Sequence, residues 1–167
     1  AIAAQQSPSQ LLTYLAAELG YFSECGLELE LVEFPGSTKA MEALLGGSVD
    51  VVSGYHEQAL QLPAGAPPMQ SFVAMTNGLL GALAVSPEAA AVIRSLDQLP
   101  GHTVGVTALG SATHLWLNAL LLKRNLRPDQ ITPVAISTAA RAVAAIENGV
   151  VSAAVVSDFT VRTLEKK

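Results

Sequence analysis

Charged residues and basic clusters are scarce in this chain of 167 residues. Asp, Glu, Lys and Arg make up 14% of it, against about 25% in an average soluble domain. Nucleic-acid binding needs a clustered basic surface, whereas this sequence has a net charge of −5 and no cluster of Lys or Arg. We therefore expect no nucleic-acid partner.

Disulfide and metal chemistry also find little support. Cys25 is the only cysteine, so no disulfide can form within the chain and no thiolate metal site is expected. The three histidines are dispersed, with no carboxylate at metal-ligand spacing. We expect neither a metal nor a cofactor.

A long stretch without charge, residues 58–87, does not predict a membrane span. Pro63, Pro67 and Pro68 interrupt it together with several glycines, whereas a spanning helix needs about 20 consecutive apolar residues. Half of the chain is hydrophobic, with Ala, Val and Leu dominating. This composition is typical of a well-buried α/β protein.

Apolar periodicity predicts strands and helices in alternation, a pattern that favours a mostly parallel sheet. We expect strands at 1–5, 27–34, 49–55, 69–76, 81–86, 103–108, 131–136 and 151–157. We expect helical segments at 7–22, 36–47, 57–62, 111–125, 138–149 and 159–167, with a short helix and turn at 87–101.

The two halves of the chain are also similar to each other. A shift of 102 residues superimposes them without a gap, pairing Ile2 with Val104, Ser9 with Ser111, Lys39 with Arg141 and Gly47 with Gly149. We therefore expect two βαβ lobes of one architecture, lobe one at 1–80 and lobe two at 81–167. The counterpart of strand 69–76 would begin past Lys167, so lobe two is expected to be incomplete.

Four segments, in this order, resemble the substrate-binding proteins of ABC importers for nitrate, sulfonates, taurine and thiamine-precursor pyrimidines. They are "YLAAELGYFSECGLELELVEF", "ALLGGSVDVVSGYHEQALQL", "SLDQLPGHTVGVTALGSATHLWLNALLLKRNLRPDQI" and "VAAIENGVVSAAVVSD". The resemblance implies an α/β, type II periplasmic-binding-protein-like fold with two lobes. The sequence departs from the family pattern at Pro100, Gly101, His102 and Ser152. We expect the family's return segment to lobe one to be missing.

The resemblance further implies a solute-binding component that holds a small anionic or heteroaromatic nutrient in the cleft between two lobes. Its partner would be a membrane permease of the ABC type, and its location periplasmic or extracytoplasmic, with a possible membrane anchor in the precursor. Two alternatives share the fold. A thiamine-pyrimidine synthase-like enzyme needs a cofactor lysine and a Cys/His iron set, and a ligand-sensing domain of a regulator needs an effector segment. We expect no enzyme activity.

The bend "GSATH" before the helix at 111–125 allows three interpretations. Ser111 or Thr113 can cap the open N–H groups of the helix, or these groups can hold an anion. A third hypothesis makes Ser111 a nucleophile with His114 as its base. It lacks the G-x-S-x-G pattern and a nearby Asp or Glu as third member.

Other candidate ligand contacts follow strands in the same way, because ligands of open α/β sheets bind beyond the carboxyl ends of the strands. Each has a structural alternative as a turn or a helix cap. With the bend above, the full set of expected ligand contacts is Gln6, Ser7, Ser9, Gly36, Ser37, Tyr55, His56, Gly110, Ser111, Ala112, Thr113 and Asp158.

The strands expected at 69–76 and 81–86 are apolar and uncharged. Such strands are poor candidates for exposed sheet edges. If the return segment is missing, uncovered edges of this kind favour a dimer.

Overall fold

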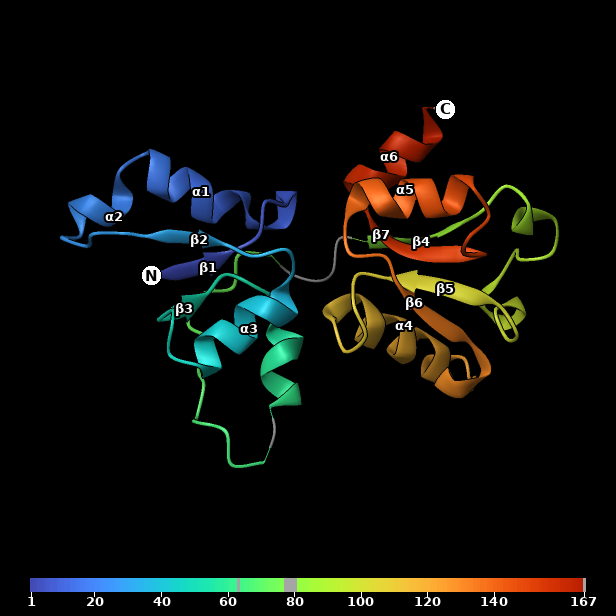
Figure 1. Cartoon of the computed structure of the whole chain (residues 1–167), viewed down its shortest axis with the longest axis horizontal. Helices are drawn as coiled ribbons and strands as arrows, with labels where there is room; N and C mark the ends of the chain where they lie inside the picture. The colour runs from blue at the N-terminus through green and yellow to red at the C-terminus, as the bar shows by residue number, and fades with distance from the viewer. Residues whose placement is uncertain (63, 77–80, 167) are drawn as a thin grey trace. The chain divides into compact units, whose positions relative to one another are not determined.

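Two separate sheets form the framework of the chain (Figure 1). The computed structural model describes residues 1–62, 64–76 and 81–166, without the side chains of Asp158 and Phe159. It divides the chain into two units, unit 1 (Ala1–Leu79) and unit 2 (Leu80–Lys167). Each unit is described by itself below.

Unit 1 contains a parallel sheet of three strands in the order β2-β1-β3. Its strands are β1 (Ile2–Ala4), β2 (Leu31–Glu33) and β3 (Val51–Val52). Its α-helices are α1 (Leu11–Glu18), α2 (Tyr21–Glu24) and α3 (Ser37–Leu45), and its 3₁₀ turns are Pro8–Gln10 and His56–Gln61. Figure 1 shows α1 and α3 on opposite faces of this sheet.

Unit 2 contains four strands in the order β4-β7-β5-β6. β4 runs antiparallel to β7, and the other pairs are parallel. The strands are β4 (Gly81–Val85), β5 (Thr103–Val106), β6 (Thr132–Ala135) and β7 (Ala153–Ser157). The helices are α4 (Ala112–Lys123), α5 (Ala139–Glu147) and α6 (Asp158–Glu165), with 3₁₀ turns at Ala89–Ala91, Leu96–Gln98 and Pro128–Gln130.

The internal repeat extends to the register of the strands. Ile2 lies opposite Leu31 and Val51 in unit 1, and the residues 102 positions later, Val104, Pro133 and Ala153, pair in the same way. Helices α3 and α5 begin and end at equivalent positions. Both are followed by a glycine with positive φ, Gly47 at 73° and Gly149 at 65°. The two halves therefore share one βαβαβ topology.

The sheet of unit 2 is buried on both faces. Along β7, Ala153 and Val155 pack into a cluster with Leu117 and Leu121 of α4. The alternate residues of β7 pack into a second cluster with α5 and α6 on the other face. A strand covered on both sides is expected to be apolar throughout, which explains the run "AAVV".

Unit 1 has a much smaller core. Its buried apolar residues among those described are Ala3, Ala4, Ala40 and Val49, and α3 covers one face of its sheet. On α1, Leu12 is 53% exposed and Leu15 42%. An apolar hollow extends along α1, α3, β3 and residues 67–76. The dimer expected from uncovered sheet edges stays a prediction.

Four predicted elements differ from the structure. Residues 69–76 form no strand, and Phe72 and Val73 are largely exposed. This segment has the alternating pattern of a strand, but a strand also needs a neighbour with which to pair, and the described residues supply none.

The strand predicted at 27–34 is confined to β2, because β1 begins at Ile2, opposite Leu31, and leaves no partner for the preceding residues. The helix predicted at 7–22 is interrupted at Gly20, whose φ of 79° is left-handed. The segment 87–101 contains short 3₁₀ turns in place of an α-helical turn.

Gly105 provides a test of packing between the strands and the loop after β6. A Cβ on this residue would lie 2.6 Å from Cδ1 of Ile136 and 3.0 Å from Cβ of Ala154. We expect Gly105→Ala to lower the free energy of unfolding by about 1–3 kcal/mol, the usual cost of overpacking. Urea unfolding measures it. Adding Ile136→Val removes the clashing methyl group and should relieve the strain, so additive losses in the double variant would contradict this account.

Candidate functional site

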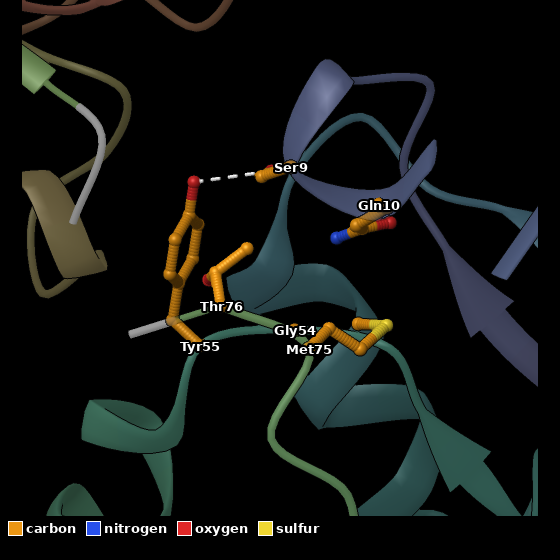
Figure 2. Close-up of a pocket in the computed structure, with 6 residues that line it drawn as sticks. All are labelled: Ser9, Gln10, Gly54, Tyr55, Met75 and Thr76. Atoms are coloured by element: carbon orange, nitrogen blue, oxygen red, sulfur yellow. Dashed lines mark hydrogen bonds between the residues drawn. The ribbon is translucent and has the colours of Figure 1, made fainter. Parts of the chain in front are cut away.

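Polar residues gather where the strands of each unit end. In unit 1, a small pocket follows β1 and β3 (Figure 2), and its lining residues are Ser9, Gln10, Gly54, Tyr55, Met75 and Thr76. The hydroxyl of Tyr55 donates to Oγ of Ser9 over 3.2 Å. Oγ of Ser9 in turn lies 2.7 Å from Oγ of Ser7. The structure thus brings three of the predicted contacts, Ser7, Ser9 and Tyr55, together.

Gln10 is the most buried polar side chain of this pocket, with 3% of its surface exposed. Its Oε1 accepts a hydrogen bond from the backbone N–H of Gln5. This contact fixes which end of the amide is the oxygen. Figure 2 shows the amide nitrogen on the side that faces Tyr55 and Thr76.

Met75 and Thr76 reach the pocket because hydroxyl groups hold the chain beside α1. Oγ1 of Thr13 lies 2.8 Å from Oγ of Ser53 and donates to Sδ of Met75 over 3.4 Å. Thr13 and Ser53 are both buried. The extended segment that forms no strand therefore still helps to build the pocket.

Two other predicted contacts of unit 1, Gln6 and His56, form hydrogen bonds outside the small pocket. Nε2 of Gln6 donates to Oε1 of Glu33 over 2.5 Å, and Nδ1 of His56 lies 2.8 Å from Oγ of Ser71. Glu33 also accepts from the hydroxyl of Tyr14 over 3.5 Å. Burial, and then the negative charge of Glu33, raise the pKa of Tyr14 above its ordinary value. Neither Gln6 nor His56 lines the small pocket.

Gly36 and Ser37 lie at the start of α3, outside the small pocket. Gly36 is the N-cap residue, and no side chain caps the helix. Ser37 is buried, and Oγ1 of Thr38 is buried without a hydrogen-bond partner among the described residues. The N–H groups of this first turn therefore have no side-chain acceptor.

Three hydroxyl groups form a closed ring between the end of β5 and the start of α4. Oγ1 of Thr107 lies 2.9 Å from Oγ of Ser111 and 2.8 Å from Oγ1 of Thr113, and the latter two atoms are 2.9 Å apart. Oγ1 of Thr113 also accepts from the backbone N–H of Thr107 over 2.9 Å. These side chains hold the bend together and do not cap α4.

The geometry gives no support to a Ser111–His114 pair. Ser111 is 2% exposed, and its hydroxyl bonds within the ring. Nδ1 of His114 accepts from the backbone N–H of Gly110 over 2.9 Å. The imidazole therefore contacts the backbone of the bend, and the hydroxyl contacts two threonines.

The remaining predicted contact, Asp158, begins α6, and its side chain lies outside the described residues. Ala112 is buried at the first position of α4. Across the described ranges, no group of three or more His, Cys, Asp and Glu could hold a metal ion. Likewise, none of the helices in these ranges is both long and apolar enough to cross a membrane.

Sequence reasoning missed Gln10, Met75 and Thr76 in unit 1 and Thr107 in unit 2. Gln10 sits among the apolar residues of a predicted helix, and Met75 within a predicted strand. The internal repeat contains a signal for Thr107, because the shift of 102 residues pairs it with Gln5. Both residues follow the first strand of their half, and the backbone N–H of Gln5 contacts Gln10.

The hydroxyl ring predicts a stability difference between two similar substitutions. Thr113→Val removes the acceptor of the Thr107 N–H and should cost about 1–3 kcal/mol. Thr38→Val removes a buried hydroxyl that has no partner among the described residues, so it should be neutral or stabilising. Urea unfolding of both variants measures the difference, and equal losses would contradict a structural role of the ring.

Comparison with known proteins identifies the family and fold of the chain. A search of curated protein sequences gives no match. A solved structure from Bordetella bronchiseptica RB50 is 30% identical with a TM-score of 0.85, covering 99% of this chain and 53% of that one. The periplasmic aliphatic sulphonate binding protein SsuA of Escherichia coli is 25% identical with a TM-score of 0.71, covering 99% and 56%.

The alkanesulfonate-binding protein SsuA of Xanthomonas axonopodis pv. citri, solved with bound MOPS, is 27% identical with a TM-score of 0.62, covering 94% and 53%. The chain therefore spans just over half the length of these three structures. The family model described as NMT1/THI5 like matches residues 7–167. The chain belongs to this NMT1/THI5-like family, and its α/β units have the periplasmic-binding-protein fold.

Proposed function

We propose that this chain is part of the solute-binding component of an ABC import system and that its solute is a small organic sulfonate. The observation that carries the proposal is the likeness to two sulfonate-binding proteins, which are 25% and 27% identical over at least 94% of this chain. The partner would be a membrane permease, and the protein would work outside the cytoplasm.

The chemistry of the pocket in unit 1 supports an oxyanion. Its six lining residues carry no charged side chain, so no carboxylate repels an anion there. Amide N–H and hydroxyl groups donate hydrogen bonds to oxyanions without a full positive charge. A sulfonate is ionised throughout the physiological pH range, so it needs donors from the protein and no acceptor for a proton.

The start of α4 supplies a second set of donors. No side chain caps this twelve-residue helix, so its first N–H groups are open to an anion. The N–H of Ser111 itself is not among them, because it donates to the carbonyl of Ala108 over 3.1 Å. We propose that the predicted contacts at Ala112 and Thr113 act through their backbone N–H groups.

Calorimetry against three ligand classes tests the proposed solute. We expect ethanesulfonate or taurine to bind with one site and to raise the melting temperature, since saturation at 100 times Kd stabilises a protein by about 2.7 kcal/mol. Nitrate and a hydroxymethylpyrimidine serve as the competing anion and the heteroaromatic ligand. Tighter binding of either, or turnover of any ligand on prolonged incubation, would contradict a sulfonate-binding function.

Ala112→Pro tests the donors of α4. Proline is tolerated at the first position of a helix, and Ser111 has the extended ψ of 168° that a residue before proline prefers. Losing one N–H contact should weaken sulfonate binding about tenfold, or roughly 1.4 kcal/mol.

Ala139→Pro is the matched control, at the first position of α5. That helix is already capped, because the side chain of Thr138 accepts from the N–H of Arg141. The Ala139→Pro variant should bind the sulfonate with the affinity of the parent protein. Unchanged affinity in a folded Ala112→Pro variant would contradict a ligand contact at this N–H and leave the start of α4 with a structural role alone.

A further inference from the structure

We infer that the side-chain amide of Gln10 is a ligand contact that donates from Nε2 to an oxygen of the bound anion and selects against cationic solutes. The inference rests on the proposed function and names a residue that the sequence motifs do not single out. It also assigns the pocket of unit 1 to the charged end of the solute.

The burial of Gln10 is the first argument. The side chain lies at the end of the 3₁₀ turn that precedes α1 and is 3% exposed. Burying an amide is unfavourable unless its hydrogen bonds are made. Oε1 makes one, to the N–H of Gln5, whereas Nε2 donates to no residue that the structure describes. The buried amide therefore has donor capacity left over.

The direction of this unused donor is the second argument. The contact with Gln5 holds the oxygen at one end, so the nitrogen is held at the other (Figure 2). There it faces the pocket lined by Ser9, Tyr55 and Thr76. A backbone donor thus orients a side-chain donor, and the amide needs no rearrangement to meet a ligand.

The neighbouring hydroxyl groups complete a donor set. Oγ of Ser9 accepts from the Tyr55 hydroxyl. When Ser7 also donates to it across their 2.7 Å contact, both acceptor positions of Ser9 are occupied. What Ser9 then has left is its own proton. Gln10 and Ser9 would together offer N–H and O–H donors, which fit a group with three acceptor oxygens and no proton.

The substitution Gln10→Glu isolates the donor. The new carboxylate keeps an oxygen for the N–H of Gln5 but replaces the NH₂ group with a negatively charged acceptor. We expect calorimetry to show at least a tenfold loss of ethanesulfonate affinity.

Gln98→Glu is the matched control in unit 2. Oε1 of Gln98 likewise accepts from backbone N–H groups, those of Arg94 and Ser95, over 2.7 and 3.1 Å. Gln98 is exposed and lines neither pocket described in unit 1. This variant adds the same charge to the chain, and its affinity for ethanesulfonate should stay within twofold of the parent.

A measurement on the unmodified protein covers the case in which Gln10→Glu does not fold. In ¹H–¹⁵N spectra, the side-chain NH₂ signals of Gln10 should shift during titration with ethanesulfonate, while those of Gln98 stay in place. Tight binding that leaves both the Gln10 signals and the Gln10→Glu affinity unchanged would overturn this inference and leave the proposed function standing. No binding of ethanesulfonate by the parent protein would overturn both.

Discussion

The parallel pairing of three strands in each half is the constraint on which the other features depend. Parallel strands cannot be joined by tight hairpins, so each must be followed by a crossover, here a helix. All carboxyl ends of the paired strands then lie at one edge of the sheet. In unit 1 this brings the residues after β1 and β3 together, although Ser9 and Tyr55 are 46 positions apart in sequence. The position of the pocket is therefore set by the strand topology, and the side chains determine only its chemistry.

The same topology produces two very different cores. In unit 2, β4 pairs with the outer side of β7, and α6 packs against both strands, so that side chains such as Val155 and Val156 are buried on opposite faces. In unit 1, no described strand pairs with the outer side of β3. Its buried apolar residues are no larger than valine, and leucines of α1 stay exposed. The repeat thus fixes the connections within a unit but not the amount of surface that each unit buries.

Periodicity predicted most of this framework because buried strands and amphipathic helices carry local signals. Helix α5 and strand β7 lie within the predicted ranges, since their apolar residues face the core at regular intervals. The failures arise where local pattern and available partner disagree. The run 69–76 alternates like a strand but has no described neighbouring strand. Residues 27–30 alternate equally well, but they precede Leu31, where the pairing with β1 begins. No local signal reports how long the neighbouring strand is.

The site shows a related limit, because residue type predicts polarity but not which groups remain free. Ser111 and Thr113 have the small hydroxyl side chains typical of an anion-binding bend, yet their hydroxyls bond to each other and to Thr107. Each hydroxyl has one proton, so a closed ring of three leaves none to spare. Gln10, which no motif marks, has two amide protons, and its one hydrogen bond is accepted by the amide oxygen. The groups that keep hydrogen-bonding capacity are therefore amides in each unit taken by itself: the side chain of Gln10 in unit 1, and the uncapped backbone N–H groups at the start of α4 in unit 2.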